Sequence, residues 1–381
     1  MRIVTHNGKI HADECAAVSL LSSYFANKGV EVYVLRTRDA SKFLDSDCLV
    51  DVGGEYDHTR LRYDHHQSDF SEKWNTESSS LLSSAGLIWR HYGREIIEMY
   101  LSNNAEQYDY GFNYSETTIE ELLNIIYEKL ILEIDAHDNG ISIIGGMNIS
   151  ELICAVNCND VSDDETQNAN FNRAVSLIGN IFDIKFKEII NSYFNFHRDL
   201  EVVKSILRDD DKQKGYLIVN ENIPTIFKCL NEIDPICNIR FCIFFNKDKN
   251  EYTIKARRTL GQKFLPVCPI IPEEKLKSLL CSDCEDIIFV HKASFLAKTR
   301  SLTCAEKIVQ LSLQNEVHES ISEESFEENI CISDTSNSEQ KCENKNLKFD
   351  ISIVKENKLA TGLALGSIAA FSYFYFTNKN D

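Results

Sequence analysis

The segment Cys48-Leu49-Val50-Asp51-Val52-Gly53-Gly54 predicts a short buried strand that carries an acidic residue near its end and stops at a glycine pair. Three more short strands are predicted around it, and a helix that begins at Asp13 separates the first two strands of the chain. These additional strands are Arg2–Thr5, Val32–Leu35 and Arg60–Tyr63. Strand, helix, strand and strand in this order indicate an α/β fold with a parallel sheet.

Polar residues follow several of these predicted strands. Ligands of parallel α/β sheets bind beyond the carboxyl ends of the strands, and His6 and Asp51 lie at or near such ends. The densest group is Asp64-His65-His66, an acid and two imidazoles in a chain with ten histidines. A further group, Asp135–Gly140, closes a helix predicted to begin at a Thr117 or Thr118 capping box and to reach Ile134. Carboxylates at the C-terminal end of a helix are electrostatically disfavoured, which indicates a cation nearby.

The residues at these loop ends are imidazoles and carboxylates without cysteine, a combination that suits Mn²⁺, Zn²⁺ or Fe²⁺. They are His6, His11, Asp13, Asp51, Asp64, His65, His66, Asp135 and Asp138. A surface pair or a capping contact explains any one of these pairs by itself, but four clusters at strand or helix ends favour a metal site. The set is too large for one ion and sufficient for two, and two metals about 3.5–4 Å apart form a standard site for phosphate-ester hydrolysis. Asp51 is the best candidate for a bridging carboxylate.

The remainder of the chain predicts a second, smaller α+β domain. Asn159–Asn170 has the composition of a linker, and Phe171–Leu207 predicts a long amphipathic helix. The later elements are strands at Phe241–Phe245, Tyr252–Ala256 and Ile287–Val290 and a helix at Leu302–Leu313. The predicted domains are 1–158 for metal binding, 159–207 as linker and connecting helix, 208–313 as C-terminal domain, 314–355 as acidic disordered linker and 356–377 as membrane anchor.

The anchor prediction rests on Leu359–Phe376, which carries no charge and has lysines on both sides. A helix buried against the core is the alternative. If the segment spans a bilayer, the mitochondrial outer membrane or the endoplasmic reticulum would hold it. The 13 cysteines show no framework pattern and the chain begins with a predicted strand, so we expect a reducing intracellular compartment.

The composition narrows the classes of function. A net charge of −19 excludes a protein that coats nucleic acid non-specifically. The single Cys281-Ser282-Asp283-Cys284 motif lacks the second pair that a structural zinc site requires. No phosphate loop, dinucleotide fingerprint or nucleophile elbow is present.

Six motifs together resemble the melanocyte-proliferating-gene exonuclease family, a branch of the Asp-His-His (DHH) phosphoesterase superfamily. They are Thr5–Glu14, Arg36–Asp39, Val50–Gly54, Tyr63–Gln67, Leu82–Leu87 and Asp135–Gly140. The resemblance runs from residue 1 to about 313 and is most specific over the first 145 residues. It implies a DHH-type catalytic domain, a smaller substrate-binding domain and an active site in the cleft between them. It also implies a metal-dependent nuclease that degrades single-stranded RNA or short oligonucleotides from 3′ to 5′, in the mitochondrion or nucleus.

The superfamily also implies roles for individual residues. One ion would take His6, His11 and Asp51, and the other would take Asp13, Asp51, His65 and Asp135, with Asp138 as the open alternative to Asp135. Asp51 and His66 would be catalytic, with His66 on the scissile phosphate, and Asp64 would orient the histidines from outside the metal shell. The cofactors would be two divalent ions, Mn²⁺ first, with Mg²⁺ or Zn²⁺ as alternatives.

The C-terminal domain departs further from the family pattern. Phe289–Phe295 resembles the family motif Phe-Val-His-Ala-Ser-Gly-Phe with an inserted lysine, and Leu296-Ala297 stand where glycines usually follow. The candidate phosphate contacts are Arg36, Arg38, Lys298 and Arg300, whereas Arg257 and Arg258 are expected to be solvated surface charges. Two other functions stay open: a non-catalytic, membrane-tethered metal-binding protein, and a phosphatase or oligonucleotide hydrolase with smaller substrates.

Overall fold

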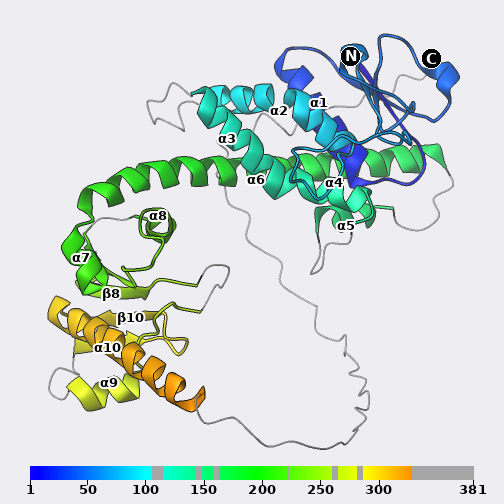
Figure 1. Ribbon diagram of the computed structural model, residues 1–381. Helices are drawn as coiled ribbons and strands as arrows, with labels where there is room; N and C mark the ends of the chain where they lie inside the picture. The colour runs from blue at the N-terminus through cyan, green and yellow to red at the C-terminus, as the bar shows by residue number, and fades with distance from the viewer. Residues whose placement is uncertain are drawn as a thin grey trace, which may run out of the picture. The chain divides into compact units, whose positions relative to one another are not determined.

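The chain folds into two compact units that divide between Tyr193 and Phe194 (Figure 1). The computed structural model describes residues 1–104, 115–141, 148–157, 163–220, 223–259, 265–280 and 286–327. Each unit has its own five-stranded sheet, and the helix α6 (Asp164–Ile206) contributes to both units. The predicted α/β class with a parallel sheet is confirmed.

The sheet of the first unit has the strand order β2-β1-β3-β5-β4. Its first four members are parallel, and β4 pairs antiparallel with β5 at the edge. The strands are β1 (Arg2–Thr5), β2 (Tyr33–Arg36), β3 (Cys48–Val50), β4 (Tyr56–Asp57) and β5 (Arg62–Tyr63). Ile3, Val4 and Val50 have no exposed surface, as expected for β-branched residues in strands covered on both faces.

Helix α1 (Ala12–Asn27) connects β1 to the parallel strand β2 and is buried from Ala12 to Tyr24. It packs against α2 (Ser84–Asn103), and a helix buried on nearly all sides belongs to the core. Its first turn therefore brings Asp13 and Glu14 into the interior, where each needs a partner.

The helices that follow complete the first unit and position the last predicted ligands. They are α3 (Glu116–Ile126), the π-helical turn η3 (Tyr127–Ile131), α4 (Leu132–Asp138) and α5 (Ile149–Cys154). One continuous helix was predicted here, but the π turn interrupts it and α4 continues to Asp138. The N-cap is Ser115, whose side chain accepts a hydrogen bond from the Thr118 backbone, so the predicted capping box at Thr117 or Thr118 is wrong.

The second unit has a mostly antiparallel sheet in the order β6-β7-β8-β10-β9, in which only β6 and β7 are parallel. Its strands are β6 (Tyr216–Val219), β7 (Phe241–Asn246), β8 (Glu251–Ala256), β9 (Ile287–Val290) and β10 (Leu296–Thr299). Its helices are α7 (Asp209–Lys214), α8 (Ile226–Ile233), α9 (Glu273–Leu280) and α10 (Leu302–Glu327). One apolar cluster joins Ile243 and Ile254 to Ile308 of α10, and another joins Leu217 to Leu230 of α8.

Several boundaries differ from those predicted. Helix α2 spans Ser84–Asn103 rather than about Ser80–Tyr92, because Asp13 accepts hydrogen bonds from the first backbone N–H groups of the helix. Helix α6 begins at Asp164, within the predicted linker, and α10 continues past Leu313 to Glu327.

Arg257 was expected at the surface, and that expectation is wrong. Its guanidinium is buried and lies 3.0 Å from Asp234 Oδ2. It also donates to the backbone oxygens of Leu230 and Asp234, so Arg257 links α8 to the sheet.

Three further predictions concern residues outside the described part of the chain. They are the Cys281–Cys284 motif, residues 328–355 of the acidic linker, and the membrane anchor at 356–377. Within the described part of the chain, no helix combines the length and the apolar character needed to cross a bilayer.

Candidate metal centre

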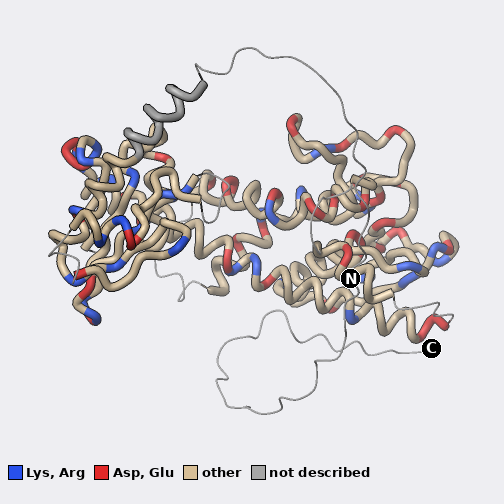
Figure 2. Tube along the Cα trace, turned by 90° about the horizontal axis from the view of Figure 1, so that it is seen from below, with Lys and Arg blue, Asp and Glu red and all other residues tan. Residues whose placement is uncertain are grey.

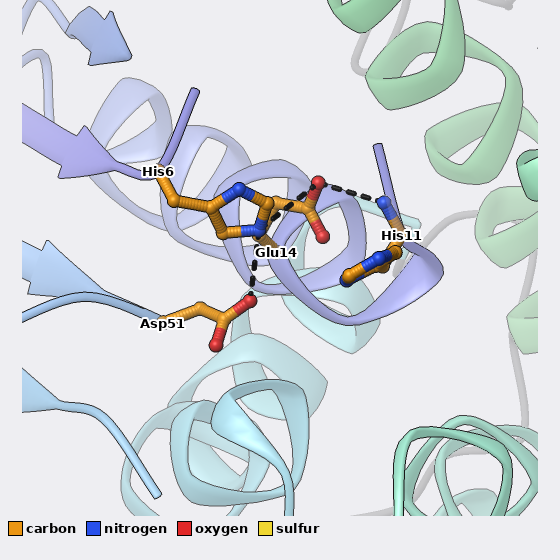
Figure 3. Close-up of side chains that lie close together, drawn as sticks. All are labelled: His6, His11, Glu14 and Asp51. Carbon is orange, nitrogen blue, oxygen red and sulfur yellow. Dashed lines mark hydrogen bonds and ion pairs between the residues drawn. The ribbon is translucent and has the colours of Figure 1, made fainter. Parts of the chain in front are cut away.

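A first cluster of potential metal ligands lies where β1, β3 and α1 come together (Figure 3). His6 follows β1, Asp51 follows β3, and His11 and Glu14 lie at the start of α1. His6 Nε2 is 3.1 Å from Asp51 Oδ2 and 3.6 Å from Glu14 Oε1. Glu14 Oε1 also accepts a hydrogen bond from the His11 backbone N–H at 2.8 Å, which fixes the loop that carries His11. Each of the four residues offers one ligand atom, and these atoms lie within 4.8 Å of one another.

Two more clusters continue from the first. Asp51, His65 and His66 form the second, and Asp13, His65 and Asp138 form the third. His65 Nε2 lies 3.0 Å from Asp138 Oδ2, 3.7 Å from Asp13 Oδ2 and 3.8 Å from Asp51 Oδ1. Because Asp51 and His65 each belong to two clusters, the three groups form one continuous set of ligands.

Asp51 is the residue that joins the two ends of this set. Its Oδ2 faces His6, whereas its Oδ1 lies 3.4 Å from His66 Nδ1 and 3.8 Å from His65 Nε2. The backbone of Asp51 has a positive φ of 53°, and its N–H donates to Tyr63 O at 3.0 Å. A left-handed conformation is uncommon for a residue with a side chain, although aspartate tolerates it better than most. It turns the chain out of β3 while Asp51 remains buried.

The electrostatics of the clusters favour positive charge. Burial opposes protonation of His6, but its contacts with Asp51 and Glu14 outweigh that effect and raise its pKa to about 10. Burial likewise opposes protonation of His65, whereas the contacts with Asp138 and Asp13 raise its pKa to about 9. The negative potential that holds protons on these imidazoles would equally bind a divalent cation, which then displaces the protons.

Buried atoms without hydrogen-bond partners support the fit to a metal. Among the described residues, these atoms include His6 Nε2, His65 Nε2, Asp51 Oδ1 and Glu14 Oε2. Buried polar atoms nearly always have hydrogen-bond partners, so several ligand atoms in one place that lie close together without a hydrogen bond require an explanation. Imidazole nitrogens and carboxylate oxygens together are ligands for a first-row divalent ion, and the residues present therefore fit such an ion.

Asp135 and Asp138 differ in what they contact. Asp135 Oδ1 accepts from Ser83 N at 2.9 Å and Ser83 Oγ at 2.7 Å, and its Oδ2 accepts from Tyr127 Oη at 2.8 Å. Burial raises the pKa of Asp135 to about 6, against the lowering effect of the Ser83 hydrogen bonds. Asp135 thus fastens α4 to the start of α2, while Asp138 is the member of the ligand set.

A family model matches residues 2–313 of the chain. Its label is MYG1_exonuc, and its description reads "Uncharacterised protein family (UPF0160)". The chain belongs to this family.

Individual relatives of this MYG1_exonuc member align over parts of their length. The MYG1 protein C27H6.8 of Caenorhabditis elegans is 33% identical over 231 residues, which cover 58% of this chain and 64% of that protein. The MYG1 exonuclease of Homo sapiens is 36% identical over 190 residues, which cover 46% of this chain and 48% of that protein. The crystal structure of RecJ in complex with Mn²⁺ from Thermus thermophilus matches 84% of this chain and 52% of its own, at 12% identity and a TM-score of 0.22. The chain thus spans less than two thirds of the length of each of these proteins.

The three residues of the Asp-His-His motif in this MYG1_exonuc member have different surroundings. His65 is buried among the ligands, whereas the side chain of His66 is 65% exposed. Asp64 Oδ1 lies 2.7 Å from His66 Nδ1, and Asp64 Oδ2 accepts from the backbone of Gly54 at 2.7 Å. Burial opposes ionisation of Asp64, but the contacts with His66 and Gly54 lower its pKa to about 2. Asp64 therefore holds His66 by one nitrogen, which is the contact expected of an orienting residue.

The four candidate phosphate contacts are divided between the two units. Arg36 donates to Gly8 O at 2.9 Å and stacks on Phe171, so it holds the loop between His6 and His11. Arg38 is exposed in the loop after β2. Lys298 and Arg300 belong to the second unit, and Lys298 Nζ is engaged by Glu251 Oε1 at 2.6 Å. The predicted cleft between the domains stays a prediction.

Glu14 is the member of the ligand set that sequence reasoning missed. It follows His11 by three residues at the start of a helix, a spacing typical of a capping contact. The capping contact exists, but only one carboxylate oxygen makes it, and the other has no hydrogen-bond partner among the described residues. The signal available in the sequence was an acidic residue in the first turn of the helix that follows the first strand.

Proposed function

We propose that the chain is a phosphodiesterase that depends on two divalent metal ions and removes nucleotides from the 3′ end of single-stranded RNA. The observation that carries this proposal is the position of Asp51, whose two oxygens face two different groups of histidines. A carboxylate shared in this way is suited to bridge two ions.

The ligand set divides naturally around Asp51. His6, His11 and Asp51 would hold one ion, with Glu14 beside them, and the second would be held by Asp13, Asp51, His65 and Asp138. The mixture of imidazole and carboxylate favours Mn²⁺, with Zn²⁺ or Mg²⁺ as alternatives. When bound, two divalent ions supply Lewis-acid chemistry, because they lower the pKa of water and neutralise charge on a phosphoryl group.

His66 is the side chain placed to handle the substrate phosphate. Asp64 engages its Nδ1, which leaves Nε2 of a 65% exposed ring available as a donor. The hydrogen bond that His66 Nδ1 donates to Asp64 raises the pKa of His66, against the effect of burial, and so favours the protonated form that can donate to a phosphoryl oxygen. His66 would therefore orient the phosphate while the buried residues hold the ions.

A groove on the second unit supports a nucleic-acid substrate. It encloses about 500 Å³ and is lined by Lys228, Lys255, Arg258 and Phe295, and none of the described residues in its wall is acidic. The Arg258 guanidinium lies 5.6 Å from the centroid of the Phe295 ring. Cations beside an aromatic ring suit the phosphates and bases of a single strand. Figure 2 shows Lys and Arg positions interspersed with Asp and Glu positions along the trace of this unit.

The finer parts of the proposal come from relatives. The human relative is named an exonuclease, and the motif resemblance to the melanocyte-proliferating-gene exonuclease family supplies the preference for RNA and the 3′-to-5′ direction.

A specific observation favours a second candidate, a non-catalytic metal-binding protein. Leu296 and Ala297 stand in β10 where the family motif has glycines, and Lys298 is engaged by Glu251.

The test is hydrolysis of a short single-stranded RNA labelled at its 5′ end, in the presence of Mn²⁺. The full chain should produce a ladder shortened from the 3′ end and release nucleoside monophosphates. Asp51→Asn should slow the reaction by more than about a hundredfold, because even the outer-shell partners of metal ligands are worth roughly 10–100-fold. Asp57→Asn, the same change at the cap of a surface turn, should leave the rate within about twofold of the unaltered chain.

Two results would count against the proposal. Asp51→Asn with full activity would contradict the role of Asp51. No release by the unaltered chain from RNA, DNA or small phosphoesters would favour the non-catalytic metal-binding candidate.

A further inference from the structure

Two imidazoles outside the ligand set are stacked face to face in the first unit. The ring centroids of His58 and His91 lie 3.8 Å apart, with an angle of 2° between the ring planes. His58 begins the 3₁₀ turn η2 (His58–Arg60), which connects β4 to β5, and His91 lies in α2. His91 is partly buried, whereas His58 is exposed. The pair therefore joins an exposed turn at the edge of the first sheet to α2.

Each ring is also held by a tyrosine hydroxyl. His91 Nε2 lies 2.8 Å from Tyr56 Oη of β4, and His58 Nδ1 lies 2.7 Å from Tyr63 Oη of β5. The hydroxyl of Tyr63, a fully buried residue, lies 3.0 Å from Tyr92 Oη of α2. A neutral imidazole accepts a hydrogen bond at one nitrogen, whereas a protonated imidazole only donates. The hydrogen bonds of the pair therefore depend on the charge of each ring.

The surroundings of His91 disfavour a positive charge. Burial lowers the pKa of His91, His58 and Arg90 lower it further, and the result is about 4. Glu72 acts in the opposite direction, but its carboxylate is paired with Arg90 at 2.5 Å. A proton on His91 would therefore be poorly compensated as long as the stack is closed.

The charged residues next to His58 are engaged with partners of their own. Asp57 accepts a hydrogen bond from the Thr59 backbone at 2.9 Å, and Arg60 is paired with Glu55 at 2.5 Å. Neither carboxylate is paired with His58. The exposed ring of His58 can move into solvent, whereas His91 is fixed within a long helix.

We propose that the stacked imidazoles of His58 and His91 form an acid-sensitive contact, which holds η2 on α2 while both rings are neutral and opens when His91 gains a proton. A folded-state pKa below the ordinary value of 6.5 stabilises the closed contact above that pH, and the stabilisation is lost as the pH falls from about 6.5 to about 4. Since β5 ends directly before Asp64, acid would loosen the strand that precedes the Asp-His-His motif. The contact is independent of the proposed nuclease, because neither metal nor substrate takes part in it.

The test is hydrogen–deuterium exchange of the full chain at a neutral and at an acidic pH, corrected for the intrinsic effect of pH on exchange. Between about pH 7.5 and about pH 5, the opening constant of residues 56–63 should rise roughly tenfold, as linkage to one partly exposed group requires. His91→Phe keeps an aromatic ring in the stack without a nitrogen to titrate, so the same change of pH should alter its opening constant by less than about twofold. His197→Phe, the same substitution on α6 in the second unit, is the matched control and should keep the pH dependence of the unaltered chain.

NMR titration of the full chain with labelled histidine measures the protonation itself, with the His91 signal assigned by its loss in His91→Phe. The midpoint should lie well below 6.5 in the unaltered chain and move toward 6.5 in His58→Ala, which removes the stack and keeps His91. His58→Ala should also exchange faster at both pH values, with little dependence on pH. A His91 midpoint at or above 6.5, an opening constant that does not change with pH, or an unaltered pH dependence in His58→Ala would each overturn the acid-sensitive contact. RNA hydrolysis is not read in these measurements, so their failure leaves the proposed nuclease untouched.

Discussion

Asp135 and Asp138 lie less than one turn apart in α4, yet their carboxylates have different neighbours. Asp135 is saturated by Ser83 and Tyr127, whereas Asp138 faces His65. Asp138→Asn should therefore weaken Mn²⁺ binding by at least roughly 10–100-fold and change stability little. Asp135→Asn should lower the free energy of unfolding by about 1–3 kcal/mol, since it disturbs a buried hydrogen-bonded carboxyl. Calorimetry with Mn²⁺ and urea unfolding of the metal-free chain measure the two effects, and the reverse pattern would show that Asp135 is the ligand.

The types of residue at the centre are readable from sequence because strand ends of a parallel sheet meet at one edge. His6, Asp51 and His65 come together for that reason. The choice between Asp135 and Asp138 was not readable, because it depends on Ser83 and Tyr127, which lie far from each other in the chain. The neighbours of Arg36 were not readable for a similar reason. Its acceptor, Gly8 O, is a backbone atom, and backbone acceptors leave no mark in a sequence.

The N-terminus of α2 is the element around which the acidic residues are arranged. Asp13 accepts from the N–H groups of Ser84 and Ala85, and Asp135 accepts from Ser83. The first backbone N–H groups of a helix lack intrahelical partners, and they carry partial positive charge. This helix end therefore stabilises two buried carboxylates, one of which, Asp13, belongs to the set of potential metal ligands.

Gly86 is required by this arrangement. A Cβ at this position would lie 2.5 Å from Asp135 Oδ1 and 2.6 Å from Oδ2. Gly86→Ala should therefore displace the carboxyl and lower the free energy of unfolding by about 1–3 kcal/mol, as overpacking does in a well-filled core. Asp135→Ala removes the atoms that the new methyl group would meet, so the double variant should lose less than the sum of the single losses. Strict additivity in urea unfolding would show that Gly86 and Asp135 are independent.

Elements with a strong local pattern could be predicted, and those fixed by distant contacts could not. β1 and β9 have the predicted bounds because short β-branched or apolar runs mark them. The start of α2 depends on Asp13, more than seventy residues earlier in the chain. The π turn η3 places Tyr127 where it donates to Asp135 and stacks on Trp74, with ring centroids 4.2 Å apart. Such turns often occur at functional sites, but hydrophobic periodicity does not reveal them.

The chain as a whole carries a net charge of −19, which repels a polyanion. We therefore expect a polyanion to contact the chain at the basic groove of the second unit. Arg258→Gln should raise the KM for single-stranded RNA. It should also make the plot of log association constant against log salt concentration less steep by about 0.7, the value expected for one phosphate contact on a single strand. The kcat should stay within about twofold, because Arg258 is not among the potential metal ligands. Lys249→Gln, on the turn between β7 and β8, is the control and should leave both quantities unchanged. An equal effect of the two substitutions would show that general charge, rather than the groove, attracts RNA.

The architecture of the whole chain could be predicted in class but not in its boundaries. Alternation of strands and a helix in the first part predicted the parallel sheet, and short strands after residue 208 predicted a separate α+β region. Composition misled at two places, because the polar stretches at 164–170 and 314–327 are helical. Polar residues can occupy the exposed face of a long helix, so polarity alone does not mark a linker.

The central claim is that Asp51 joins two metal positions in one site. Calorimetric titration of Mn²⁺ into the metal-free full chain tests it directly, with Asp51→Asn titrated in parallel. Asparagine tolerates the left-handed backbone of position 51, so the substitution removes charge without imposing strain. The unaltered chain should bind two ions, and Asp51→Asn should bind at most one. Two ions bound by Asp51→Asn with unaltered affinity would contradict the account.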